Sequence, residues 1–258
     1  MIQKIEKHIV ELEAMKRYPK ELYALGDLSL LKRPKVSIVG TRRPSFYTQN
    51  MTKDLASSLA KRGVCLVSGA AMGVDALVHQ GAGFSNTIAV VANSLDIRYP
   101  AVNRHMIEAI EKEGLVLSQF PVTTKAAPWS FVVRNELVVA LGEVLIVTEA
   151  DENSGSMRSV EFALNMGKEI YVIPQRLGES RGTNWLLKEG LAKPIYDIEL
   201  FSDRYGIAPK NSLEKDDFFY FCQTTPTLDE AISSYSDRVY EAELEGIIEI
   251  KNGLIYLL

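Results

Sequence analysis

The sequence has few of the residues that metal, redox or nucleophilic chemistry requires. Its 258 residues include two cysteines, Cys65 and Cys222, and three histidines, and none of these has the spacing of a metal site. No Gly-x-Gly-x-x-Gly pattern follows the first apolar run, which argues against a dinucleotide cofactor. We therefore expect neither a bound metal nor a cofactor.

Long apolar stretches are also missing. No run approaches the roughly 18 residues that a membrane-spanning helix needs. The segment MIQKIEKHIVELEAMKRYPKEL at the start carries charges throughout and has no apolar signal core. Together with the two widely separated cysteines, these features predict a cytoplasmic protein in a reducing environment that does not bind a membrane.

The charged residues are unevenly distributed along the chain. The formal net charge is −4, but residues 211–258 hold ten acidic and three basic side chains, which leaves a net charge of +3 on residues 1–210. The mildly basic part permits a local basic pocket. Phosphates would repel the acidic part, so we expect that part to contact protein rather than DNA.

Apolar runs alternate with stretches of helical period along residues 34–205. Two helical stretches, 47–63 and 103–114, end in glycines typical of helix C-terminal caps. Buried strands that alternate with helices of about 10 to 15 residues predict right-handed βαβ units. The fold class is therefore α/β, an extended Rossmann-like, doubly wound, mostly parallel sheet. The predicted strands are KVSIVG (35–40), GVCLVSG (63–69), TIAVVA (87–92), LVLSQ (115–119), EVLIVTE (143–149) and EIYVIP (169–174).

The two ends of the chain differ from this core. Residues 1–33 indicate an N-terminal helical extension of two short helices, and residues 206–214 indicate a linker. Residues 215–258 predict two helices and a hairpin that turns at Lys251-Asn252-Gly253, because Asn-Gly is typical of tight hairpin turns. We expect this last segment to form a small winged-helix-like domain.

Four loops follow predicted strands at one edge of the sheet, where open parallel sheets bind their ligands. In the first, Gly40-Thr41 lets the backbone approach a ligand, and Arg42 and Arg43 follow directly. Exposed amides, a helix start and guanidinium groups together make an anion site, although a tight turn with solvated arginines has the same pattern. The loop Ser154-Gly155-Ser156 adds amides and hydroxyls at a second helix start.

A third loop combines aromatic and basic side chains. Lys125 precedes Trp129 and Phe131, and Arg134-Asn135 then enter an apolar helix. Aromatic rings beside cations suit a single-stranded nucleic acid, because its bases stack while its phosphates pair with cations. Core packing explains the rings equally well, and one of the two is expected to serve that purpose.

The remaining loop offers a histidine and an aspartate. Gly69 and Gly73 allow a tight turn against the sheet, and His79 lies four residues after Asp75, on the same helical face. A catalytic pair is one interpretation, but no nucleophilic serine or cysteine accompanies it. We favour a partly buried histidine whose hydrogen bonds are satisfied.

Five segments carry a family resemblance: VGTRRPSFY, SGAAMGVDALVHQGA, TIAVVANSLDIRYPAVNRHM, FVVRNELVVALGEVLIVTEADENSGSM and GTNWLLKEGLA. Their order and spacing resemble those of the DNA-processing protein A family (DprA, also called Smf). The resemblance covers about residues 15–200, and the winged-helix-like tail is similar to a domain that many members carry.

The resemblance implies a single-stranded DNA-binding protein of natural transformation. It implies that the protein protects incoming strands, helps to load the RecA recombinase, forms a homodimer and has no catalytic residue. Edge strands near KPIYDI (193–198) are candidates for the dimer surface. Arg42 maps to the family's phosphate pocket. The residues expected to bind DNA are Gly40, Thr41, Arg42, Arg43, Gly69, Lys125, Phe131, Arg134, Asn135, Ser154, Gly155 and Ser156.

Three positions depart from the family pattern. Met72 stands where members often have arginine, Glu136 stands at the last position of an Arg-Asn-Arg motif, and Pro128 stands where relatives can carry a basic residue. Each change removes positive charge or adds negative charge, and Lys125 replaces the lost cation only imperfectly. We expect ordinary pocket geometry, reduced cationic strength and a steep dependence on salt.

An enzyme of related fold is the competing interpretation. Nucleoside-monophosphate phosphoribohydrolases of the lysine-decarboxylase-like Rossmann family need a Pro-Gly-Gly-x-Gly-Thr loop and a glutamate on the helix that follows. The segment ADENSGSMRSVEF contains Glu161 but lacks the glycine-rich run. We therefore prefer a binding protein that is not an enzyme.

Overall fold

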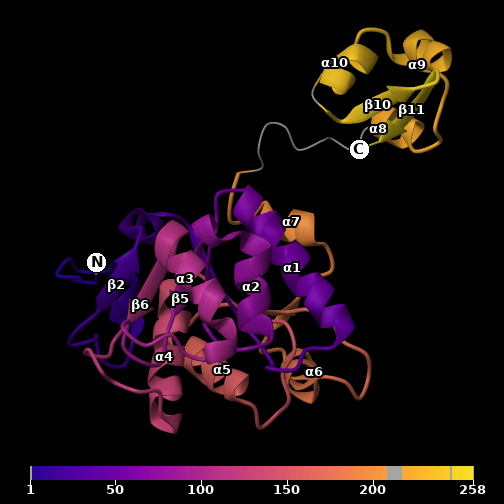
Figure 1. Cartoon of the computed structure of the whole chain (residues 1–258). Helices are drawn as coiled ribbons and strands as arrows, with labels where there is room; N and C mark the ends of the chain where they lie inside the picture. The colour runs from indigo at the N-terminus through magenta and orange to yellow at the C-terminus, as the bar shows by residue number, and fades with distance from the viewer. Residues whose placement is uncertain (1, 208–216, 245, 258) are drawn as a thin grey trace. The chain divides into compact units, whose positions relative to one another are not determined.

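The computed structural model describes residues 2–207, 217–244 and 246–257. It divides into two compact units, Met1–Ala208 (unit 1) and Pro209–Leu258 (unit 2) (Figure 1). The linker expected at residues 206–214 lies outside the described residues from 208 onward. No helix in the described ranges is long and apolar enough to cross a lipid bilayer.

Unit 1 is built on a nine-stranded sheet with the order β1-β2-β6-β5-β4-β3-β7-β8-β9. The seven neighbouring strands β6, β5, β4, β3, β7, β8 and β9 pair in parallel. At the β6 edge, β2 pairs antiparallel with β6, and β1 pairs antiparallel with β2. All six predicted strands are present, so the doubly wound, mostly parallel fold is confirmed. The strands are β1 (Gln3–Lys4), β2 (Tyr23–Gly26), β3 (Lys35–Val39), β4 (Cys65–Gly69), β5 (Thr87–Val90), β6 (Leu115–Ser118), β7 (Leu145–Val147), β8 (Ile170–Val172) and β9 (Lys193–Pro194).

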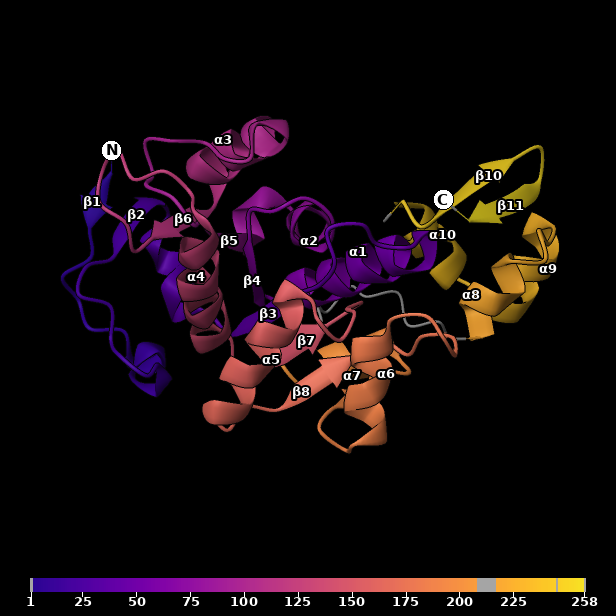
Figure 2. The same cartoon turned by 90° about the horizontal axis from the view of Figure 1, so that it is seen from below.

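Helices cover both faces of this sheet (Figure 2). Side chains of α1, α2 and α7 share one buried cluster, and α3 contributes to a second. On the other face, α4, α5 and α6 pack in a third cluster. The helices are α1 (Phe46–Lys61), α2 (Val74–Ala82), α3 (Arg104–Glu113), α4 (Pro128–Leu141), α5 (Gly155–Asn165), α6 (Arg181–Lys188) and α7 (Ile198–Ser202), with the short 3-10 helices η3 (Phe84–Asn86) and η4 (Ala101–Asn103).

The N-terminal segment is more than the two helices that the sequence predicted. Two short 3-10 helices occur, η1 (Val10–Ala14) and η2 (Leu28–Lys32), but β1 and β2 also extend the main sheet. β2 pairs antiparallel with β6, and the fully buried Leu12 of η1 packs into the same cluster as α4. Residues 1–33 therefore belong to the same compact unit as the Rossmann-like core.

Unit 2 has its own small core of apolar side chains from all its described elements. Within its described residues, three helices precede the hairpin, where the sequence predicted two. The predicted turn is present but consists of Asn252-Gly253, both with positive φ (52° and 75°), as a tight hairpin turn requires. The elements are α8 (Asp217–Cys222), α9 (Leu228–Tyr235), α10 (Arg238–Leu244), β10 (Ile248–Lys251) and β11 (Leu254–Leu257).

The strand order places a topological switch point between β3 and β7. The chain leaves β3 through α1 toward β4, and it leaves β7 through α5 toward β8, on the opposite side. The loops after these two neighbouring strands therefore diverge to opposite faces of the sheet. Open α/β sheets bind ligands in the crevice that such a divergence leaves.

Candidate functional site

A cavity of about 640 Å³ lies at this switch point. Its wall brings together residues from the loops after β3, β4 and β7 and from the first half of α4. Arg43 and Lys125 are exposed and do not line it. Ten of the twelve residues expected to bind DNA line the cavity: Gly40, Thr41, Arg42, Gly69, Phe131, Arg134, Asn135, Ser154, Gly155 and Ser156.

Backbone hydrogen bonds fix the loop that carries Arg42. Thr41 donates its amide to the carbonyl of Glu149 (2.8 Å), and its carbonyl accepts from the amide of Val74 (3.1 Å). Gly73 packs directly against this loop with a φ of +79°. A Cβ at Gly73 would lie 2.4 Å from the carbonyl oxygen of Thr41. Only glycine allows this close approach. Arg42 therefore projects from a backbone held by both the β7 loop and the start of α2.

The Arg42 side chain lies over an aromatic ring. Its Cζ is 5.3 Å from the centroid of Phe131, and the Cζ of Arg134 is 5.9 Å from the same centroid. Both distances suit cation–π contact. Phe131 lies on the first turn of α4, which Pro128 begins and where Ser130 accepts a hydrogen bond from the Ala127 amide (2.9 Å). Arg42, Arg134 and the Phe131 ring thus line the cavity together.

Arg134 has a different environment from the one that the sequence suggested. Its side chain is only 6% exposed and donates to the carbonyl of Val90 (2.9 Å). Its Nη1 also lies 3.7 Å from Oδ2 of Asp75. Burial raises the pKa of Asp75 and lowers that of Arg134, while the charge of each opposes the shift of the other. Arg134 is therefore a buried side chain that contacts Phe131, and its part in DNA binding stays a prediction.

Glycine at position 69 makes room for that guanidinium group. A Cβ at Gly69 would lie 1.6 Å from Nη1 of Arg134 and 2.3 Å from Oδ2 of Asp75. Any larger residue would displace the Arg134–Asp75 pair. The sequence predicted Gly69 as part of the pocket, and the structure adds the reason why glycine is required.

The start of α5 forms the opposite wall. Ser154, Gly155 and Ser156 line the cavity, and a Cβ at Gly155 would meet no atom within 4 Å. These residues begin an eleven-residue helix, whose dipole favours an anion at this end. Seven buried side-chain atoms of the described residues have no hydrogen-bond partner, and three of them belong to residues that line the cavity: Oγ of Ser154, Oγ of Ser159 and Nε of Arg134.

Sequence reasoning missed one cation of this wall, Arg158. It lines the cavity and pairs with Glu161 one helical turn later (2.9 Å between Nη1 and Oε2). Its position in the first turn of α5 could have identified it, because side chains there flank the helix N-terminus. Glu161, the residue that the hydrolase interpretation requires, is exposed and held by this ion pair.

His79 is structural, as the sequence analysis favoured, and it is fully buried. Its ring nitrogens contact Oγ1 of Thr87 (2.6 Å) and the carbonyl of Gly69 (2.7 Å), while Asp75 lies against Arg134. Burial lowers the pKa of His79 to about 4, so the ring is neutral near pH 7. The described residues include no group of three or more His, Cys, Asp or Glu that could hold a metal.

The other residues singled out from the sequence lie around the cavity. Trp129 is 58% exposed and packs edge-on against Phe120 (5.6 Å between centroids), whereas Phe131 lines the cavity. Oε1 of Glu136 accepts a hydrogen bond from the Lys16 amide (2.8 Å). The acidic departure from the family motif therefore attaches the N-terminal segment to α4.

Comparisons with known proteins identify the family of the chain. Residues 3–206 match the family described as DNA recombination-mediator protein A. The chain belongs to this family. Its relatives include the DNA processing protein DprA of Bacillus subtilis, 34% identical over 186 residues, and the protein Smf of Escherichia coli, 30% identical over 218 residues. These matches cover 70% and 80% of this chain but 62% and 58% of the relatives' own lengths, so the chain spans about three fifths of each.

Two solved structures of DprA proteins share the fold. DNA processing protein A from Helicobacter pylori, described for its single-stranded DNA binding mode, is 42% identical with a TM-score of 0.77 over 79% of this chain and 94% of its own. DprA from Streptococcus pneumoniae is 29% identical with a TM-score of 0.74 over 80% and 75%.

Proposed function

We propose that this DprA family member binds single-stranded DNA in the cavity at the β3–β7 switch point. The contact between Arg42 and Phe131, opposite the open N-terminus of α5, carries this proposal. A nucleotide needs a cation and amides for its phosphate and a flat ring for its base, and both kinds of group line this one cavity. The DNA binding described for the Helicobacter pylori relative supports the same function.

The cavity favours a single strand over a duplex. Phe131 offers its ring inside a cavity, and only an unpaired base can leave its neighbours to stack there. The cationic side chains of the wall are few, Arg42 and Arg158, while Arg134 is neutralised by Asp75. Electrostatic attraction to a phosphate backbone is therefore modest, and base stacking contributes a large share of the affinity.

The proposal assigns no catalytic residue. Asp75 and His79 hold pocket elements in place, and Glu161 pairs with Arg158 at the surface. Unit 2, whose residues from 211 onward carry a net charge of −7, contacts protein rather than DNA in this account. Removal of residues 209–258 should leave single-strand affinity unchanged or slightly higher, because phosphates would repel their acidic side chains.

The family supports a proposal about the biological role. We propose that the chain acts in natural transformation, protects incoming strands and helps to load a RecA recombinase, as its family description of a recombination mediator supports. A direct test is the rate of RecA filament formation on DNA coated with single-strand binding protein. Addition of this chain should raise that rate, and no change would contradict the role.

We further propose a homodimer through the β9 edge. Tyr196 and Leu200 follow this edge strand and are 86% and 63% exposed. An edge strand beside exposed apolar side chains is suited to pairing with a second copy. Tyr196→Lys should convert a dimer into a monomer in light scattering. A wild-type chain that is monomeric at micromolar concentration would contradict this proposal.

The experiment for the main proposal is fluorescence anisotropy with a labelled oligothymidine, with duplex DNA and AMP as competitors. The account predicts binding that weakens as salt is raised, with the small slope that a few phosphate contacts give, and that resists both competitors. Absence of oligonucleotide binding, together with conversion of AMP to adenine and ribose phosphate, would establish the competing hydrolase.

A further inference from the structure

Tyr99, on the loop after β5, lies beside the cavity. Its ring centroid is 6.3 Å from that of Phe131, with 58° between the ring planes. This separation is within the range of about 4.5–7 Å over which aromatic pairs interact. Phe131 lines the cavity and Tyr99 does not, so the second ring extends the aromatic surface outward from the cavity wall.

Packing of the protein core does not account for the Tyr99 ring. The residue is 47% exposed and belongs to none of the four hydrophobic clusters that the described residues form. An aromatic ring that is half exposed and borders a second ring at a cavity mouth leaves one side available to a ligand.

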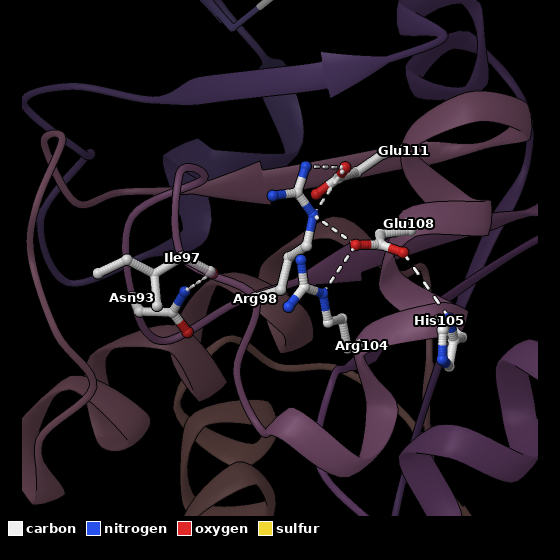
Figure 3. A network of polar contacts seen from close by, with 7 residues as sticks. All are labelled: Asn93, Ile97, Arg98, Arg104, His105, Glu108 and Glu111. Atoms are coloured by element: carbon white, nitrogen blue, oxygen red, sulfur yellow. Dashed lines mark hydrogen bonds and ion pairs between the residues drawn. The ribbon is translucent and has the colours of Figure 1, made fainter.

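Ion pairs hold the neighbouring residue, Arg98, against α3. Nη2 of Arg98 lies 2.7 Å from Oε2 of Glu111, and Nε lies 3.6 Å from Oε1 of Glu108 (Figure 3). The Glu111 side chain is only 9% exposed, so this contact is shielded from water. The residue next to Tyr99 is therefore fixed to a helix of the core rather than free in solvent.

Further hydrogen bonds hold both ends of this loop. Asn93 donates from Nδ2 to the carbonyl of Ile97, as Figure 3 shows, and Asn103 donates to the carbonyl of Ala70 (3.0 Å). Ser118 donates its hydroxyl to the Asn93 carbonyl (2.6 Å). A loop held at these points presents its tyrosine with little loss of conformational entropy on binding.

We propose that Tyr99 is a second base-binding side chain, which stacks with the nucleotide adjacent to the one held at Phe131. This inference rests on the proposed function, because it needs a strand whose phosphate lies in the cavity. The ligand is then at least a dinucleotide of single-stranded DNA, and the Arg98 ion pairs position the stacking ring. The 58° tilt between the rings suits two bases that are unstacked from each other.

The test compares Tyr99→Ala, Tyr99→Phe and a control, Val102→Ala, which alters a 69% exposed side chain near the same loop. Tyr99→Ala should weaken binding of oligothymidine roughly tenfold, the order expected for one stacked base. The slope of affinity against salt should stay that of the wild type, because no charge is lost. Tyr99→Phe and Val102→Ala should bind within about twofold of the wild type, because both keep the ring.

An oligonucleotide series with one abasic residue at successive positions provides a second, independent measurement. The wild type should lose affinity at two adjacent positions, and Tyr99→Ala should become insensitive at one of them. Wild-type affinity in Tyr99→Ala, with binding abolished in Arg42→Ala, would overturn this inference and leave the proposed function intact. If the wild type binds no oligonucleotide, the proposed function itself fails.

Discussion

The guanidinium carbon of Arg42 lies 5.3 Å from the centre of the Phe131 ring, although the two residues are far apart in the sequence. The loop after β3 supplies the cation, and the first turn of α4 supplies the ring. Cation–π contact fixes both side chains before a ligand arrives, which reduces the entropy lost on binding. In the proposed function Arg42 contacts the phosphate of a nucleotide and Phe131 stacks on its base.

Phe131 should contribute more to DNA binding than Trp129. Phe131→Ala should weaken oligothymidine binding by about 10- to 100-fold, because a stacking ring and the support of Arg42 are both lost. Trp129→Ala should change affinity less than threefold and instead lower the melting temperature, because Trp129 packs on Phe120 (5.6 Å). Anisotropy titrations of both variants measure the two losses of affinity. A larger loss in Trp129→Ala would reverse the assignment.

Gly69→Ala should damage the fold and the site together. The added Cβ would lie 1.6 Å from Nη1 of Arg134, so the guanidinium group would have to leave its contacts with the Val90 carbonyl and Asp75. We expect a loss of about 1–3 kcal/mol in the free energy of unfolding, as in other overpacked cores. Gly155→Ala is the matched control, because its Cβ meets nothing within 4 Å. Equal stability of the two variants in urea titrations would contradict the account.

Acid should destabilise the protein through His79. Burial lowers its native pKa to about 4, below the unfolded value of 6.5, so the unfolded chain binds more protons between these pH values. The free energy of unfolding should therefore fall as the pH drops from 6.5 toward 4, by about 3 kcal/mol from this group. His79→Gln should remove that part of the pH dependence. The exposed His105, changed to Gln, should leave it unchanged.

Glu161 restrains a cation of the site. It pairs with Arg158 at 2.9 Å, and both side chains are more than half exposed. Glu161→Gln should free Arg158 and raise oligothymidine affinity about two- to threefold, because exposed ion pairs are weak. Arg158→Gln should lower the affinity for oligothymidine. If this chain were instead the hydrolase, Glu161→Gln would abolish turnover of AMP, so the two functions predict opposite outcomes for one variant.

Most of the core could be predicted because its strands are buried on both faces. A parallel sheet between two helical layers requires continuous runs such as KVSIV, which stand out in any sequence. The short edge strands could not be predicted. β1 has two residues and β2 has four, YALG, which is too short for a periodic pattern. The third helix of unit 2 was missed for a similar reason, since α8 and α10 have only six and seven residues.

The composition of the cavity could be predicted, but the role of each residue could not. Loops after parallel strands meet at one edge, so Gly40 and Ser154 were expected to lie near each other. Burial depends on tertiary packing, however, and the sequence did not distinguish the exposed Arg42 from the buried Arg134. The contributions of Arg43 and Lys125, which do not line the cavity, stay predictions.

The most direct test of the account compares Arg42→Ala with Arg43→Ala in oligothymidine binding across a salt series. The two arginines are adjacent and both exposed, but only Arg42 lines the cavity and contacts Phe131. Arg42→Ala should lose at least tenfold in affinity and reduce the salt slope by about one, and Arg43→Ala should change both values much less. Wild-type affinity and slope in Arg42→Ala would contradict the claim that this cavity holds a DNA phosphate.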